Sequence, residues 1–96
     1  MELNDYVAKC HENAKNKGFW DIRQSVGTLL MLIVSELGEA LEADRKGDKD
    51  NFAEELADTF IRLCDMCGGL GIDLESAVHE KMTKNQGRPK LHGKKY

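Results

Sequence analysis

The chain has 96 residues, a single proline and 41% apolar residues, a size and composition typical of one globular domain spanning residues 1–96. It contains no run of 18 or more apolar residues, and residues 1–5 lack the basic region and apolar segment of a signal peptide, so we expect a cytoplasmic protein without a membrane span. Three cysteines in such a chain predict free thiols rather than a disulfide framework.

The net charge of −3 conceals a strong asymmetry along the chain. Residues 1–80 carry 8 basic and 17 acidic side chains, whereas residues 81–96 carry 6 basic side chains and none that is acidic. An acidic body with a basic C-terminal tail, residues 87–96, can gather a divalent cation and a phosphate chain, although a solvated tail is the commoner meaning of such an end. The acidic body argues against nucleic acid as a partner.

Helical periodicity dominates the sequence, which shows neither an alternating strand pattern nor an internal repeat. A first helix is predicted over residues 3–17, ended by Gly18, and is followed by the aromatic connector Phe19-Trp20-Asp21. A second helix is predicted over residues 22–46 and ends at Gly47.

The second half of the chain predicts two more helices. The third covers residues 50–67 and is expected to break at Gly68-Gly69 and Gly71. The fourth covers residues 74–85, and Asp73 has the character of its N-cap. We therefore expect an all-α protein built as a four-helix bundle.

The second and third helices each carry a long apolar stripe. In the second helix the stripe consists of Val26, Leu29, Leu30, Ile33, Leu37, Ala40 and Leu41. The third helix is predicted to pack through Ala53, Leu56, Ala57, Phe60, Ile61, Cys64 and Cys67. A monomer of this length buries only about 60–65% of its unfolded surface, so we expect oligomerisation to complete the core.

Two acidic motifs, Glu36-x-x-Glu39 and Glu55-x-x-Asp58, lie on these two helices. Residues three apart are separated by about 4.5 Å of rise and about 60° of rotation, so each pair points in nearly one direction. If the two helices pack antiparallel, four carboxylates converge, and their repulsion becomes tolerable only with a divalent cation or protons. Hard oxygen ligands favour Mg²⁺, with Mn²⁺ as the alternative, over zinc.

An ordinary solvated helix face explains one of these pairs more readily than the other. Glu36 lies about 60° from Ile33, inside the apolar sector, where a carboxylate is costly unless something compensates it. Glu55 and Asp58 fall almost opposite the apolar stripe of their helix, so a wet face stays an open alternative there. Arg62, four residues after Asp58, is a potential salt-bridge partner for it.

The acidic motifs stand in a series with two further motifs toward the C-terminus. In chain order the four are Ser35-Glu36-Leu37-Gly38-Glu39-Ala40-Leu41-Glu42-Ala43, Glu54-Glu55-Leu56-Ala57-Asp58, Gly71-Ile72-Asp73-Leu74, and Lys81-Met82-x-x-Asn85-x-x-Arg88-Pro89 with His92-Gly93-Lys94. From residue 18 to residue 96 the chain resembles the MazG-like nucleotide pyrophosphohydrolases, whose all-α superfamily includes the dCTP pyrophosphatases and dimeric dUTPases.

The resemblance implies a MazG-like helical fold and hydrolysis of nucleoside triphosphates between the α and β phosphates. It also implies a Mg²⁺ site with Glu36, Glu39, Glu55 and Asp58 as ligands, in a homodimer or dimer of dimers that binds substrate among helices of more than one subunit. In such a site the cation screens the triphosphate and activates a water, and Glu39 is the candidate to take the proton of that water.

Candidate substrate-binding residues lie on the connector and near the C-terminus. The cationic side chains near the C-terminus are suited to stabilise the departing pyrophosphate. These candidates are Lys81, Lys84, Arg88 and Lys94. Trp20 lies 16 residues before Glu36, a spacing that resembles the base-contacting tryptophan of dCTP-cleaving relatives, and its alternative role is to cover the core. Asn85 either contacts a base edge or sugar, or caps its helix.

Other potential metal or redox motifs carry less weight. Cys64-x-x-Cys67 lies on an apolar stripe without a second CxxC, which predicts buried thiols. Cys10 and His11 are adjacent and point in different directions on a helix. His79 is expected to be an ordinary helix residue.

Two other functions compete with triphosphate cleavage and nucleotide-pool clearance. The first is a related pyrophosphatase acting on a phosphoribosyl-nucleotide. The second, from a different class, is a non-enzymatic helical interaction module whose acidic faces only solvate it. A cation that binds the folded state must raise the melting temperature, which separates an enzyme from such a module.

Overall fold

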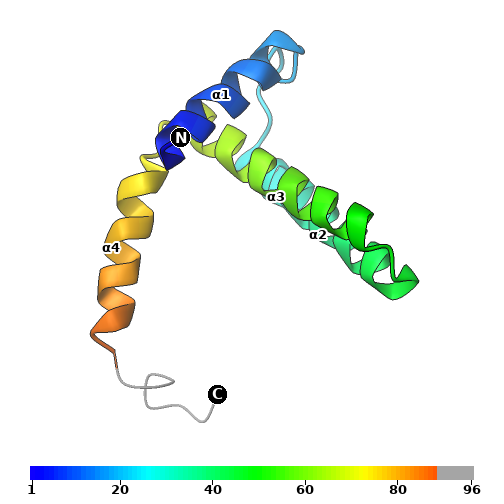
Figure 1. Cartoon of the computed structure of the whole chain (residues 1–96). Coiled ribbons are helices and arrows are strands. Elements are labelled where there is room, and N and C mark those ends of the chain that lie inside the picture. The colour runs from blue at the N-terminus through cyan, green and yellow to red at the C-terminus, as the bar shows by residue number, and fades with distance from the viewer. Residues whose placement is uncertain (89–96) are drawn as a thin grey trace.

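The computed structural model describes residues 1–88, and these form four α-helices and no strand. The helices are α1 (Leu3–Asn16), α2 (Val26–Lys46), α3 (Lys49–Leu70) and α4 (Leu74–Gln86). Figure 1 shows α2 and α3 side by side as an antiparallel hairpin, with α1 crossing the C-terminal half of α3. The all-α prediction is confirmed for the described residues.

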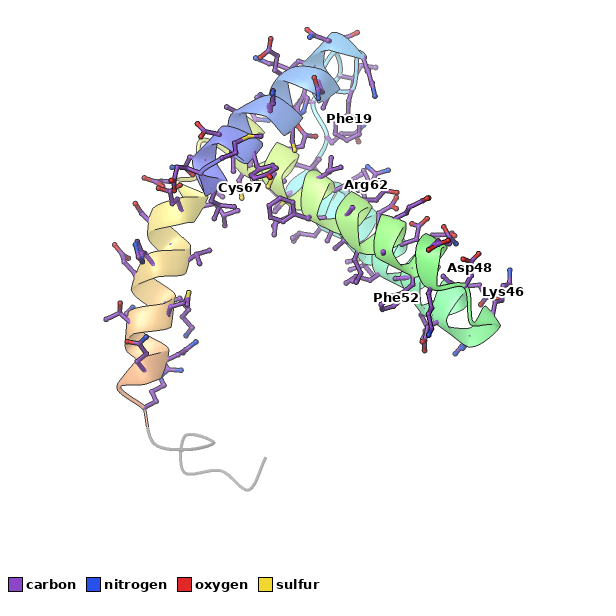
Figure 2. All side chains as sticks on the ribbon, viewed as in Figure 1. Phe19, Lys46, Asp48, Phe52, Arg62 and Cys67 are labelled. Atoms are coloured by element: carbon purple, nitrogen blue, oxygen red, sulfur yellow. The ribbon has the colours of Figure 1, made fainter. Side chains whose placement is uncertain are left out.

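The helix ends follow from local capping chemistry. Gly47, with a φ of +71°, takes the left-handed conformation that ends α2, and the Asp48 side chain accepts the Asn51 N–H at 3.1 Å to begin α3. Lys46 and Asp48 mark this turn in Figure 2. Asp73 caps α4 by accepting the Ser76 N–H at 3.0 Å, as predicted.

The predicted start of the second helix is wrong by four residues. Residues 22–25 precede α2, because the Ser25 hydroxyl accepts the Thr28 N–H at 3.1 Å and so caps the helix there. The apolar Ile22 fits the helical period but is exposed in the connector.

The predicted break at Gly68-Gly69 is also wrong, because α3 continues through both glycines and ends at Gly71, whose φ is +70°. These two residues allow close packing instead. A Cβ on Gly68 would lie 2.6 Å from Cβ of His11, and one on Gly69 would lie 2.2 Å from the ring of Trp20. Glycine is therefore required here by the approach of α1 and the connector.

One cluster of buried core residues lies where α1 crosses α3. Val7, Cys64 and Cys67 form it, and Cys64 is fully buried. All three cysteines are free, as predicted, and the buried positions of Cys64 and Cys67 confirm that this CxxC pair belongs to the core. Burial, with a smaller contribution from the neighbouring Cys10 and Cys67, raises the pKa of the Cys64 thiol to about 11.

The fourth helix projects away from the other three (Figure 1). It is joined to the start of α1 through Asn4, whose side chain donates to Asp73 at 3.0 Å and whose N–H donates to Glu75 at 3.1 Å. No residue of α4 is buried. The predicted four helices are therefore present in the described residues; within one chain α3 packs against both α1 and α2, whereas α4 contacts α1 near its own start. The Cα radius of gyration of 15.9 Å exceeds the roughly 12–13 Å of a compact chain of this length.

The predicted apolar stripes are only partly covered. In α2, Leu29 and Ala40 are buried, whereas four members of the stripe are exposed: Val26, Leu30, Leu37 and Leu41. In α3 the predicted packing is wrong within one chain over residues 53–61, where five members of its stripe are exposed: Ala53, Leu56, Ala57, Phe60 and Ile61. The cause is geometric, because α1 covers the C-terminal half of α3 and α4 projects away. None of the described helices is long and apolar enough to cross a membrane.

Candidate metal centre and adjoining pocket

The acidic side chains of α2 and α3 meet at the contact between the two helices. Glu36 comes from α2, and Glu55 and Asp58 come from α3. One carboxylate oxygen of each lies within 4.8 Å of the other two. Glu36 is largely covered, Glu55 is half-buried and Asp58 is exposed, so the cluster opens to solvent on one side. The antiparallel pairing of helices brings together groups that are about 20 residues apart in the chain.

The electrostatics of this cluster favour a bound positive charge. Partial burial raises the pKa of Glu55, and a hydrogen bond to Glu36 together with the charges of Glu36, Asp58 and Glu39 raises it further. The neighbouring carboxylates therefore destabilise the ionised form of Glu55. A divalent cation relieves that repulsion, and three hard oxygen donors fit Mg²⁺ or Mn²⁺.

The fourth predicted ligand, Glu39, lies at the edge of the cluster. It is exposed one helical turn beyond Glu36, and its charge acts on Glu55, but it is not one of the three residues whose oxygens converge. The structure thus brings together three of the four predicted ligands. Glu55 is half-buried beside Glu36, whereas Asp58 is exposed, so the solvated-face alternative stays open for that pair.

Arg62 bridges the two helices beside the acidic cluster. Its Nε donates to Oε1 of Glu36 at 3.1 Å. From the sequence, Asp58 was the potential partner of Arg62. The cross-helix pair was missed because a spacing of four residues on one helix suggests a local partner, whereas Glu36 is 26 residues away in the chain.

A pocket of about 670 Å³ adjoins the cluster. α1 and the connector supply Asn13, Lys17 and Phe19 to its walls. α2 supplies Glu36, and α3 supplies Asp58, Arg62 and Asp65. Figure 2 shows Phe19 and Arg62, which reach this pocket from the connector and from α3. The pocket has the volume of a small-molecule site and combines an apolar wall with a few charged groups.

A buried hydrogen-bond network supports the pocket wall. Oδ1 of the buried Asp65 accepts the Trp20 indole N–H at 2.8 Å and lies 3.0 Å from Nδ1 of His11. The His11 and Trp20 rings meet edge to face, with centroids 5.0 Å apart. Trp20 therefore packs between His11 and the C-terminal part of α3. Its contact with a nucleobase stays a prediction.

The predicted substrate-binding residues of α4 do not join the acidic cluster within one chain. Lys81, Lys84 and Asn85 are exposed on α4, which extends away from α2 and α3 (Figure 1). Arg88 directly follows α4, and Lys94 lies outside the described residues.

The comparison with family models identifies the class of protein. The model of the MazG nucleotide pyrophosphohydrolase domain matches residues 24–92, which include α2, α3, α4 and both acidic motifs. Because the match covers most of the chain, the protein belongs to the MazG nucleotide pyrophosphohydrolase domain family. The chain matches no curated protein and no solved structure. The family implies a nucleotide substrate and, typically, a metal-dependent hydrolase, which the three converging carboxylates fit.

Proposed function

We propose that this protein is a Mg²⁺-dependent hydrolase that cleaves nucleoside and deoxynucleoside triphosphates into a nucleoside monophosphate and pyrophosphate, and that it clears surplus or aberrant nucleotides. The observation that carries the proposal is the convergence of Glu36, Glu55 and Asp58 at the edge of a pocket, within a MazG domain. Mn²⁺ is expected to substitute for Mg²⁺ because it accepts the same oxygen ligands.

The acidic residues divide into ligands and a proton acceptor. Glu36, Glu55 and Asp58 are proposed to hold the cation, which supplies charge stabilisation to the phosphate oxygens and eases deprotonation of a nearby water. Glu39 is exposed on α2 one helical turn beyond Glu36, so it can complete the ligand set or take the proton of the attacking water. Its charge already acts on Glu55, which supports its place in the site.

The nucleoside is proposed to occupy the neighbouring pocket. Phe19 lines it and packs edge to face against Trp20, with centroids 5.8 Å apart, so the connector forms an aromatic wall against which a base can lie. Lys17 lies on the same wall and contributes positive charge for an anionic substrate.

The working enzyme is proposed to be a homodimer or a dimer of dimers. Exposed apolar side chains run along α2 and the N-terminal half of α3, and a single chain buries only a small core. A second copy that covers these stripes removes them from water. In such an assembly α4 of one subunit can reach the site of another, which would bring in the substrate-binding candidates Lys81, Lys84, Asn85 and Arg88; Lys94 lies outside the described residues.

Product analysis tests this function directly. The parent protein is incubated with each of several NTPs and dNTPs, and with a phosphoribosyl-nucleotide, in the presence of Mg²⁺. We expect monophosphate and pyrophosphate from triphosphates, and a lower kcat for Glu39→Gln than for the control Glu42→Gln, because Glu42 forms exposed ion pairs with Arg45 and Lys46. Release of orthophosphate, or no cleavage at all, would contradict the proposal.

A further inference from the structure

Arg62 occupies a position between the acidic cluster and the buried end of the pocket. Asp58, Arg62 and Asp65 stand at spacings of four and three residues, so they form one row along α3, and all three line the pocket. The rise from Asp58 to Arg62 is about 6 Å. Oδ1 of Asp65 accepts from Trp20 and lies within hydrogen-bond distance of His11, so the Asp65 carboxylate is already compensated without Arg62.

The partner of Arg62 is one of the three clustered carboxylates. The Glu36 side chain is only 16% exposed, and Arg62 Nε donates to its Oε1 at 3.1 Å. The Arg62 guanidinium therefore compensates the negative charge of the largely buried Glu36 carboxylate. A divalent cation that binds Glu36 must share this carboxylate with a guanidinium or displace it, and the two positive charges repel each other.

The guanidinium has a second class of partner available. It carries five N–H donors in a planar fork, and the pair with Glu36 uses the Nε donor. The Arg62 side chain is 37% exposed and lines the pocket, so its remaining donors can reach a ligand there. Phosphate oxygens match the fork with two parallel hydrogen bonds.

We propose that Arg62 is a substrate-binding residue that couples the cation to the nucleotide. Without ligands it pairs with Glu36, and when the cation takes Glu36, Arg62 turns to the polyphosphate of the nucleotide. This inference rests on the proposed function, since it assigns the cation and the triphosphate to the same site. Each ligand then favours the binding of the other, because the nucleotide removes Arg62 from the carboxylate that the cation needs.

Replacement of Arg62 therefore moves two affinities in opposite directions. In Arg62→Met the competitor for Glu36 is gone, so Mg²⁺ alone should bind about 5-fold or more tightly than in the parent protein. The same variant should bind the α,β-methylene analogue of the best-cleaved triphosphate about 5-fold or more weakly in the presence of Mg²⁺. Titration calorimetry measures both affinities without turnover.

Two further variants make the test specific. Arg45→Met removes an arginine whose pair with Glu42, at 3.8 Å, is exposed on α2, and it should leave both affinities unchanged. Arg62→Lys keeps the positive charge but loses the planar fork, so it should bind the analogue more weakly without gaining affinity for Mg²⁺. Circular dichroism establishes that each variant is folded, and Arg62→Lys carries the test alone if Arg62→Met is not.

The outcomes separate this inference from the proposed function. Weaker binding of Mg²⁺ alone to Arg62→Met would overturn the inference, because it would mean that Arg62 only supports Glu36 structurally. Unchanged affinity for the analogue in both Arg62 variants would also overturn it. Failure of the parent protein to release pyrophosphate from any triphosphate would instead reject the proposed function.

Discussion

The two halves of α3 differ in how far a single chain buries their apolar side chains and supplies partners for their charged ones. In the C-terminal half, Cys64 is fully buried, the Asp65 carboxylate is hydrogen-bonded, and Gly69 is in close contact with Trp20. In the N-terminal half, burial and the neighbouring carboxylates both raise the pKa of Glu55, and the apolar side chain of Leu56 is exposed. The C-terminal half therefore has a structural role. The N-terminal half presents charged groups that an ion or substrate could bind and apolar surface that another subunit could cover.

Loss of one clustered carboxylate should give the largest effect of any change in α3. Glu55→Gln removes a proposed cation ligand, so kcat/KM for triphosphate cleavage should fall by more than the roughly 10–100-fold typical of residues that only support a ligand. The neighbouring Glu54 is exposed and outside the cluster, which makes Glu54→Gln the matched control. Equal activity of the two variants in a pyrophosphate-release assay would remove Glu55 from the site.

A charge on the exposed apolar stripe of α2 should weaken subunit association. Burial of a leucine contributes about 1.5–3 kcal/mol, so Leu30→Glu should raise the dissociation constant of the oligomer more than about tenfold. Ile22→Glu is the control, because Ile22 is exposed in the connector, outside the stripe. Analytical ultracentrifugation measures both. A parent protein that sediments as a monomer at all concentrations would contradict the proposed assembly.

An added methyl group at the contact between α3 and Trp20 should destabilise the structural half of α3. Gly69→Ala places a Cβ 2.2 Å from the indole ring, and such overpacking costs about 1–3 kcal/mol in the free energy of unfolding. Gly27→Ala, where only Ser25 lies within 4 Å of the added atom, should be neutral or slightly stabilising. Urea denaturation followed by circular dichroism distinguishes them, and equal midpoints would refute the close packing.

The smallest predicted effect is an alkaline loss of stability from Cys64. Its pKa is raised from an ordinary value of 9.0 to about 11, so the fold favours the neutral thiol. The stabilisation is fully present below pH 9 and is lost as the pH rises through 11. Between these values the free energy of unfolding should fall more steeply in the parent protein than in Cys64→Ala. Parallel pH profiles would show that this thiol is not shielded from water.

The helices were predictable wherever a local signal decides their ends. Gly18 after the first helix, Gly47 and Asp73 are local signals, and each lies where the sequence predicted a helix end. The predicted break at Gly68-Gly69 was wrong because the low helix propensity of glycine is a weak signal. Here the packing of His11 and Trp20 against α3 overrides it.

The candidate site was predictable to the extent that it rests on helical angles. Glu36 stood out because a carboxylate in an apolar sector needs compensation, and it is indeed largely covered and paired. Asp65 was missed because its partners, His11 and Trp20, are 54 and 45 residues away in the chain. Arg62 was assigned a local partner for the same reason: spacing on one helix carries no information about the neighbouring helix.

Diffraction from crystals grown with Mn²⁺ tests the central claim most directly, because the ion scatters anomalously and stands in for Mg²⁺. The account predicts an anomalous peak at roughly 2.1 Å from carboxylate oxygens of Glu36, Glu55 and Asp58. A peak at another position, or these three side chains turned apart with no ion between them, would contradict it.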